Sequence, residues 1–194
     1  MYEIDAVQGY VLGYYNQGEA DRRYRILTRN FGVIHAHATS VRKEQSKLKH
    51  CLQKLNLVEI ETIQSRRGYQ ITGGRLIEPV AGTLGFRELA CLDRVGELIG
   101  RLSQNPDAET ALFTIVEQAI EQFEMNICDP EIIESWISAR VLMEFGYFDP
   151  SFCPGIDPDI FQRAQLDERG VECLNTQIKE LDRYIKQCLD QTML

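Results

Sequence analysis

The sequence predicts an α+β protein in which a small β-barrel precedes an α-helical domain. Three observations support this prediction. Five strand-like segments fall within the first 80 residues, the hydrophobic period then changes from 2 to 3.6, and the net charge reverses sign between the two halves. At 194 residues the chain can bury a substantial core. We therefore expect one domain at residues 1–80 and a second at residues 81–194.

The strand-like segments are rich in β-branched and aromatic residues, and turn-forming residues separate them. We expect strands at residues 7–15, 21–28, 33–38, 55–64 and 69–77. In the second segment Arg23 and Arg25 alternate with apolar or aromatic residues, so both arginines should face solvent. Leucines at helical spacing predict a short helix within residues 39–55. Five short strands with a helix after the third are the arrangement of an OB-fold.

A break at residues 79–85, which holds one proline and two glycines, separates the strands from helical patterns. Beyond it we expect amphipathic helices at residues 84–102, 108–123, 132–145 and 167–189. Asp129-Pro130 has the form of an N-cap followed by proline in the first helical turn. Residues 149–159 contain three prolines and should be irregular.

The composition is that of an ordinary globular chain, with 44% hydrophobic and 26% charged residues. No apolar run approaches the roughly 20 residues of a membrane span, and acids replace the basic start of a secretory signal. We therefore expect a cytoplasmic protein without membrane contact. The six cysteines are scattered without a CxxC pair, which predicts reduced, mostly buried thiols.

Motifs of catalytic sites are missing from the sequence, which has no P-loop, GxGxxG after a strand, GxSxG or HExxH. We expect neither enzymatic activity, nor a small-molecule substrate, nor a cofactor. His35 and His37 share one face of a predicted strand, and His50 and Cys51 follow. Zinc sites normally draw close ligand pairs from two places, and only one such pair is visible here. Ordinary strand histidines are the better interpretation, so no metal is expected.

Residues 1–79 carry a net charge of +4 and residues 80–194 a net charge of −12. This division predicts a nucleic-acid-binding face on the first half and protein partners for the second. Candidate phosphate-binding residues lie on the second strand and on the segment after the third: Arg22, Arg23, Arg25, Arg29, Arg42, Lys43, Lys47 and Lys49. Tyr14, Tyr15 and Tyr24 are candidates to stack on a base, although burial in the barrel is the better prediction for them.

Several short motifs follow one another between Gly9 and Leu55. They are an aliphatic strand, a Gly-Glu turn, a strand ending in Leu-Thr, a glycine turn and a basic segment before a Leu-Gln pair: Val11-Leu12, Gly18-Glu19, Leu27-Thr28, Gly32, Arg42 to Lys49 and Leu52-Gln53. In this order they resemble the N-terminal domain of the DNA repair protein RecO family. Ala139 to Cys153 also resembles that family's helix ending in Leu-Gly-Tyr, followed by a proline and a cysteine.

The resemblance implies a non-enzymatic recombination mediator. Such a protein binds single- and double-stranded DNA, anneals complementary strands, and works with RecR and the single-strand binding protein SSB to assist RecA loading. The resemblance also implies that the SSB tail docks on the helical domain, where Arg140 is the candidate partner-binding residue.

The sequence departs from the family pattern at three places. Only Cys153 remains of the zinc-site cysteines, Thr39-Ser40 replaces a common Lys-Gly, and Glu44 interrupts the basic segment. We therefore do not carry zinc over, and we expect a divergent or minimal family member. The alternative is a protein-interaction adaptor whose barrel has lost appreciable DNA binding.

Overall fold

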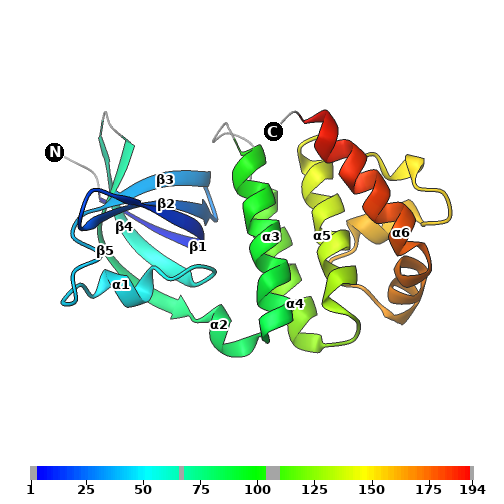
Figure 1. Cartoon of the computed structure of the whole chain (residues 1–194), viewed down its shortest axis with the longest axis horizontal. Coiled ribbons are helices and arrows are strands. Elements are labelled where there is room, and N and C mark those ends of the chain that lie inside the picture. The colour runs from blue at the N-terminus through cyan, green and yellow to red at the C-terminus, as the bar shows by residue number, and fades with distance from the viewer. Residues whose placement is uncertain (1–3, 66–67, 104–109, 193–194) are drawn as a thin grey trace. The chain divides into compact units, whose positions relative to one another are not determined.

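The computed structural model describes residues 4–65, 68–103 and 110–192 (Figure 1). Contacts within the chain divide it into two compact units. The first comprises residues 1–83 and 103–113, and the second comprises residues 84–102 and 114–194. The expected domains at residues 1–80 and 81–194 stay a prediction, because this division concerns contacts and not independent folding.

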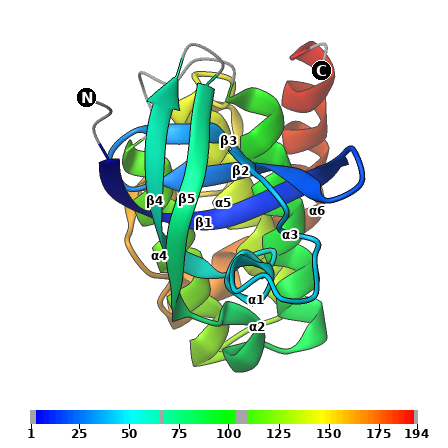
Figure 2. The ribbon, with the colours of Figure 1, turned by 90° about the vertical axis from the view of Figure 1, so that its left-hand side faces the viewer.

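The first unit contains a closed barrel of five strands, which Figure 2 shows facing the viewer. In barrel order the strands are β1 (Ile4–Gln17), β2 (Asp21–Thr28), β3 (Gly32–Ala38), β5 (Gly68–Glu78) and β4 (Leu57–Ser65). The β3–β5 pair is parallel and the other four pairs are antiparallel, with β4 closing the barrel against β1. The predicted α+β fold with an OB-like barrel at its start is thereby confirmed.

Apolar side chains at alternate positions of the strands fill the barrel. Tyr24 and Ile26 of β2 are fully buried there, because every second side chain of a strand points to the same face. The short helix α1 (Leu48–Cys51) follows β3, as expected, and contributes Cys51 to this core. The adjacent Leu52 is fully buried with it. The helix therefore anchors the basic segment that precedes it to the barrel.

Helices follow the barrel. They are α2 (Val80–Thr83), α3 (Phe86–Leu102), α4 (Thr110–Met125), α5 (Pro130–Glu144) and α6 (Glu168–Gln191), with 3-10 turns η1 (Pro150–Phe152) and η2 (Pro158–Gln162) before α6. The longer helices lie within a few residues of the predicted ones, although the expected start at Ala108 falls outside the described residues. Asp129 precedes α5 as predicted, but its side chain makes no capping hydrogen bond. Instead, its carboxylate faces Arg87 at 3.5 Å.

Helix α5 is the centre of the second unit and packs against α3, α6 and η2. Trp136, the only tryptophan of the chain, is fully buried on α5, and its Nε1 donates a hydrogen bond to the carbonyl of Ile160 at 2.9 Å. Within the part of the chain that the structure describes, no helix is both long and apolar enough to span a bilayer.

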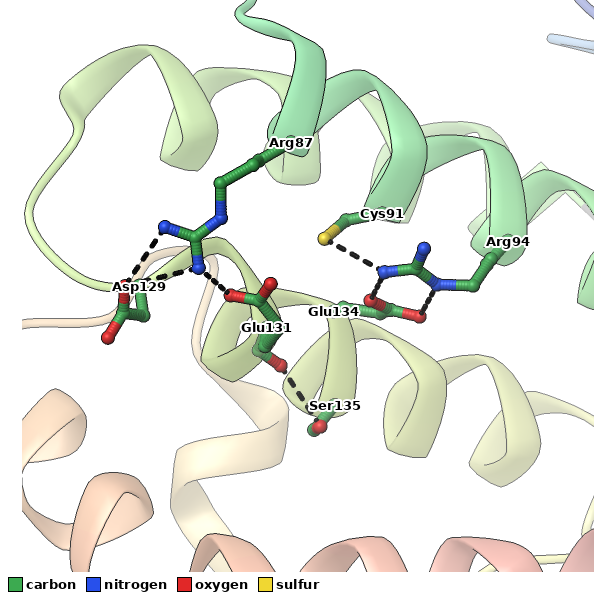
Figure 3. Close-up of polar contacts among 7 residues, drawn as sticks. All are labelled: Arg87, Cys91, Arg94, Asp129, Glu131, Glu134 and Ser135. Carbon is green, nitrogen blue, oxygen red and sulfur yellow. Dashed lines mark hydrogen bonds and ion pairs between the residues drawn. The ribbon is translucent and has the colours of Figure 1, made fainter.

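Ion pairs join α3 to α5 (Figure 3). Arg94 binds Glu134 with two hydrogen bonds, from Nε to Oε1 at 2.6 Å and from Nη2 to Oε2 at 2.5 Å. Its Nη2 also lies 3.3 Å from the Cys91 sulfur. Burial, together with the nearby Glu134, raises the pKa of the Cys91 thiol to about 12, so this cysteine stays protonated. Glu134 is only 19% exposed, which favours a stronger pair than an ordinary surface one.

Replacing Arg94 by alanine should therefore lower the free energy of unfolding of the second unit by about 1 kcal/mol. Urea unfolding followed by Trp136 fluorescence measures this loss directly. Arg183→Ala is the matched control, because Arg183 pairs with Glu180 on the exposed surface of α6 and such pairs contribute almost nothing. Equal losses in the two variants would contradict the role of Arg94.

Candidate nucleic-acid interface

Outward-facing residues form two cross-strand rows at one end of the barrel. The first row crosses β1, β2, β3 and β5 and consists of Tyr15, Arg23, His37 and Gln70. The second row crosses β1, β2 and β3 and consists of Gly13, Arg25 and His35. We call these seven residues the outer rows. Arg23 and Arg25 share this face, as the sequence alternation predicts.

The outer face is apolar toward the other end of the same strands. Tyr10, Leu27 and Val33 pair in register there and are buried. The ring of Phe113, which belongs to the same unit, lies 5.1 Å from the ring of Tyr10. The polar part of the face is therefore confined to the end where β1 turns into β2.

Arg22 and Tyr24 are two residues apart on β2, so their side chains lie on the same side of the strand, opposite that of Arg23. Its guanidinium carbon is 4.0 Å from the centre of the Tyr14 ring, and its Nε donates to Asn16 Oδ1 at 3.2 Å. Tyr14 in turn packs on Tyr24, with 5.6 Å between the ring centres. Arg22 thus belongs to an aromatic stack and not to the outer rows.

Arg29 follows β2 at the apolar end of the face. Its guanidinium lies 4.4 Å from the centre of the Phe113 ring, in a cation–π contact. Of the four arginines expected to act together on the second strand, the structure therefore brings only Arg23 and Arg25 together.

The basic segment after β3 folds back onto the turn between β1 and β2. The backbone N–H of Arg42 donates to the carbonyl of Ala20 at 2.9 Å, and its Nη1 donates to the carbonyl of Gly18 at 3.2 Å. Asp21 accepts a hydrogen bond from the backbone N–H of Ser40 at 2.7 Å. Lys43 and Lys47 are exposed, and Lys49 is partly buried. The segment begins beside the outer rows, because Thr39 and Arg23 line one hollow.

The three candidate tyrosines have different environments. Tyr24 is fully buried, as expected, so its ring is not accessible to a base. The expected burial is wrong for Tyr14 and Tyr15, which are 39% and 52% exposed. The two lie on the part of β1 that extends to its turn, where the barrel core ends. Tyr15 lies in the outer rows, and its hydroxyl accepts from Arg23 Nη1 at 3.5 Å.

Sequence reasoning missed the two strand histidines as members of this face. The signal was available, because His35 and His37 alternate along β3 as Arg25 and Arg23 do along β2. Partial burial, followed by the charges of Arg25 and Arg23, lowers the pKa of His35 below its ordinary value. His37 Nε2 lies 3.3 Å from Asp21 Oδ2, which is ion-pair distance without hydrogen-bond geometry.

The described neighbours of these histidines do not include a cluster of metal ligands. Among the residues with described positions, no group of three His, Cys, Asp or Glu side chains is arranged to hold a metal ion. Cys51, which follows His50, is buried in the barrel core. All six cysteines are free thiols, and four of them are buried.

Arg140, the candidate partner-binding residue, is only 9% exposed on α5. Its Nη2 donates to Gln118 Oε1 at 2.7 Å, and its guanidinium lies 4.8 Å from the centre of the Trp136 ring. Its Nη1 is buried without a hydrogen-bond partner. Burial lowers the pKa of Arg140, and the nearby Glu144 acts in the opposite direction. A partner at Arg140 would have to reach a nearly enclosed cation.

A closed OB-like barrel followed by helices, with arginines, histidines and a tyrosine on one outer face, defines an OB-barrel protein with a candidate nucleic-acid interface. Residues 2–80 match the family model described as recombination protein O N terminal. Curated proteins named DNA repair protein RecO, from Dehalococcoides mccartyi strains BAV1 and CBDB1, are 30% and 29% identical over 131 residues. Each match covers 67% of this chain and 51% of the relative.

The chain therefore belongs to the RecO family, as its motifs predict. It spans about half the length of the curated relatives that it matches.

The depressed pKa of His35 predicts a loss of barrel stability in acid. Because the folded pKa lies below the unfolded value of about 6.5, the unfolded chain binds more protons as pH falls through this range. Stability present at higher pH is then progressively lost below about pH 6.5. Urea unfolding followed by tyrosine circular dichroism should show a smaller acid loss in His35→Gln than in the unmodified protein. His50→Gln, on the exposed side of α1, is the control, and identical profiles for all three proteins would refute the effect.

Proposed function

We propose that the barrel binds single-stranded DNA through the outer rows, and that the protein acts as a non-enzymatic mediator of DNA repair and recombination. The observation that carries the proposal is the pair Arg23 and Arg25 on one outer face, next to the exposed Tyr15. Cations that follow a phosphate backbone and an aromatic ring that accepts a base are the usual elements of single-strand binding. Family membership supports the same function, because the matched relatives are named DNA repair proteins.

The remaining cations have unequal parts in this proposal. Arg42, Lys43, Lys47 and Lys49 extend the cationic surface from the β1–β2 turn along the basic segment. Arg22 and Arg29 contribute less, because each guanidinium already lies over an aromatic ring away from the outer rows. Binding of double-stranded DNA and annealing of complementary strands belong to the same proposal, since both require contacts with phosphates.

Replacing Arg23 and Arg25 together by alanine should flatten the plot of log affinity against log salt concentration by about 1 to 2 units, because fewer counterions are released on binding. Fluorescence anisotropy with a labelled thymidine oligonucleotide, over a series of salt concentrations, measures this slope. Arg75→Ala is the control, because Arg75 is paired with Glu59 at 2.7 Å on another part of the barrel. A slope that stays the same in the double variant would exclude this face.

We also propose RecR and SSB as protein partners, with a role in assisting RecA loading. The net charge of −12 over residues 80–194 supports partners other than DNA for this part of the chain. Arg140 offers an unpaired Nη1 to the carboxylate of an acidic peptide terminus, provided that a small opening exposes it.

Trp136 reports on such binding, since Arg140 lies over its ring. A synthetic SSB tail, an acidic peptide with a free C-terminal carboxylate, should change the Trp136 fluorescence. The same peptide with an amidated C-terminus is the control. It should bind about tenfold more weakly, because one charge-assisted hydrogen bond is lost. Equal responses to both peptides would remove Arg140 from the partner site.

The alternative function is a protein-interaction adaptor whose barrel binds no DNA appreciably. The dispersal of Arg22 and Arg29 away from the outer rows favours it, since fewer cations then act together. The two functions differ in the oligonucleotide titration. A protein that binds the peptide but shows no salt-dependent affinity for DNA is the adaptor.

A further inference from the structure

A hollow of about 340 Å³ opens at the polar end of the barrel, next to the outer rows. Arg23 and His37 form part of its wall, and Gln17, Gln70, Thr39 and Tyr69 complete most of the lining. Its volume lies at the lower end of the roughly 300–1,000 Å³ typical of small-molecule sites. A hollow of this size suits one small planar group better than a length of backbone.

The parallel pairing of β3 with β5 builds this hollow. Ala36 pairs with Tyr69 and His37 pairs with Gln70, so residues distant in sequence become neighbours. Gly68, where β5 begins, has a φ of 103°, which a side chain would disfavour. The hollow thus depends on a glycine at the start of β5 and on the register of one short parallel pair.

The groups around the hollow suit hydrogen bonding more than simple neutralisation of charge. Arg23 Nε is buried without a hydrogen-bond partner, and Nη1 makes only a long contact with the Tyr15 hydroxyl. The amides of Gln17 and Gln70 each offer a donor and an acceptor, and Thr39 offers a hydroxyl. None of the described lining residues is a carboxylate. An amide side chain can pair with two adjacent groups on the edge of a base, whereas phosphate needs only cations.

We propose that the hollow takes one nucleobase from a bound single strand. The base edge meets the amides of Gln17 and Gln70. Arg23 binds the adjoining phosphate at the rim. This inference rests on the proposed function, because the base arrives only as part of a strand held by the outer rows. It adds a preference for unpaired bases, since the edge of a base within a duplex is already hydrogen-bonded to its partner.

The test compares two labelled single strands of equal length, a thymidine oligonucleotide and an abasic oligonucleotide with the same number of phosphates. The unmodified protein should bind the thymidine strand more tightly. The double variant Gln17→Ala, Gln70→Ala should lose about fivefold or more of its affinity for the thymidine strand, and a much smaller factor of its affinity for the abasic strand. Its salt slope should stay the same, because no cation is removed. Gln165→Ala, an exposed substitution in the second unit, is the matched control.

The outcomes separate this inference from the function on which it rests. If the unmodified protein binds neither strand, the proposed DNA binding fails and the base site fails with it. If it binds both strands equally, or if the double variant loses the same factor on both, the DNA face stands and the base site is overturned. Both glutamines are exposed, so the double variant should keep the urea midpoint of the unmodified protein.

Discussion

The alternation of side chains along the strands of a closed barrel is the constraint on which the candidate interface depends. Tyr24 and Ile26 are fully buried in the core, so Arg23 and Arg25 can point only outward. A slip of one residue would bury both arginines and expose the core, which makes the register costly to change. The inner packing of β2 therefore fixes the position of the charges on its outer face.

The same constraint explains why the other arginines of this region do not join the pair. Arg22 is on the side of β2 that faces the core. It lies near the end of the strand, beyond the core, and its guanidinium stacks on the Tyr14 ring there. Arg29 lies beyond the strand and meets Phe113. A count of cations in the sequence thus overstates how many can act on one face. The position of a cation along the strand decides whether its side chain stacks on an aromatic ring or stays in solvent.

Sequence periodicity was sufficient for the strands, for most of the helices and for the shared face of Arg23 and Arg25. It could not give the row that joins Arg23 to His37 and Gln70, because the pairing of β3 with β5 is set by the closure of the barrel and not by local pattern. The sequence pattern also predicted that Asp129 caps a helix. In the structure its carboxylate makes no capping hydrogen bond and faces Arg87 of α3 instead. Local signals predict elements well, but partners distant in sequence determine what each polar side chain binds.

Affinity and selectivity are assigned to different groups on the proposed face. Arg23 and Arg25 attract any polyanion, with a strength that salt reduces, so on their own they do not distinguish a single strand from a duplex. Amide side chains carry no charge and add little to long-range attraction. They form hydrogen bonds with the edge of an unpaired base, but gain little from an edge that is already paired. A face that combines both would capture strands through charge and retain those with unpaired bases. Such a division suits a protein that acts where single strands are exposed, because duplex DNA would bind the cations without filling the hollow.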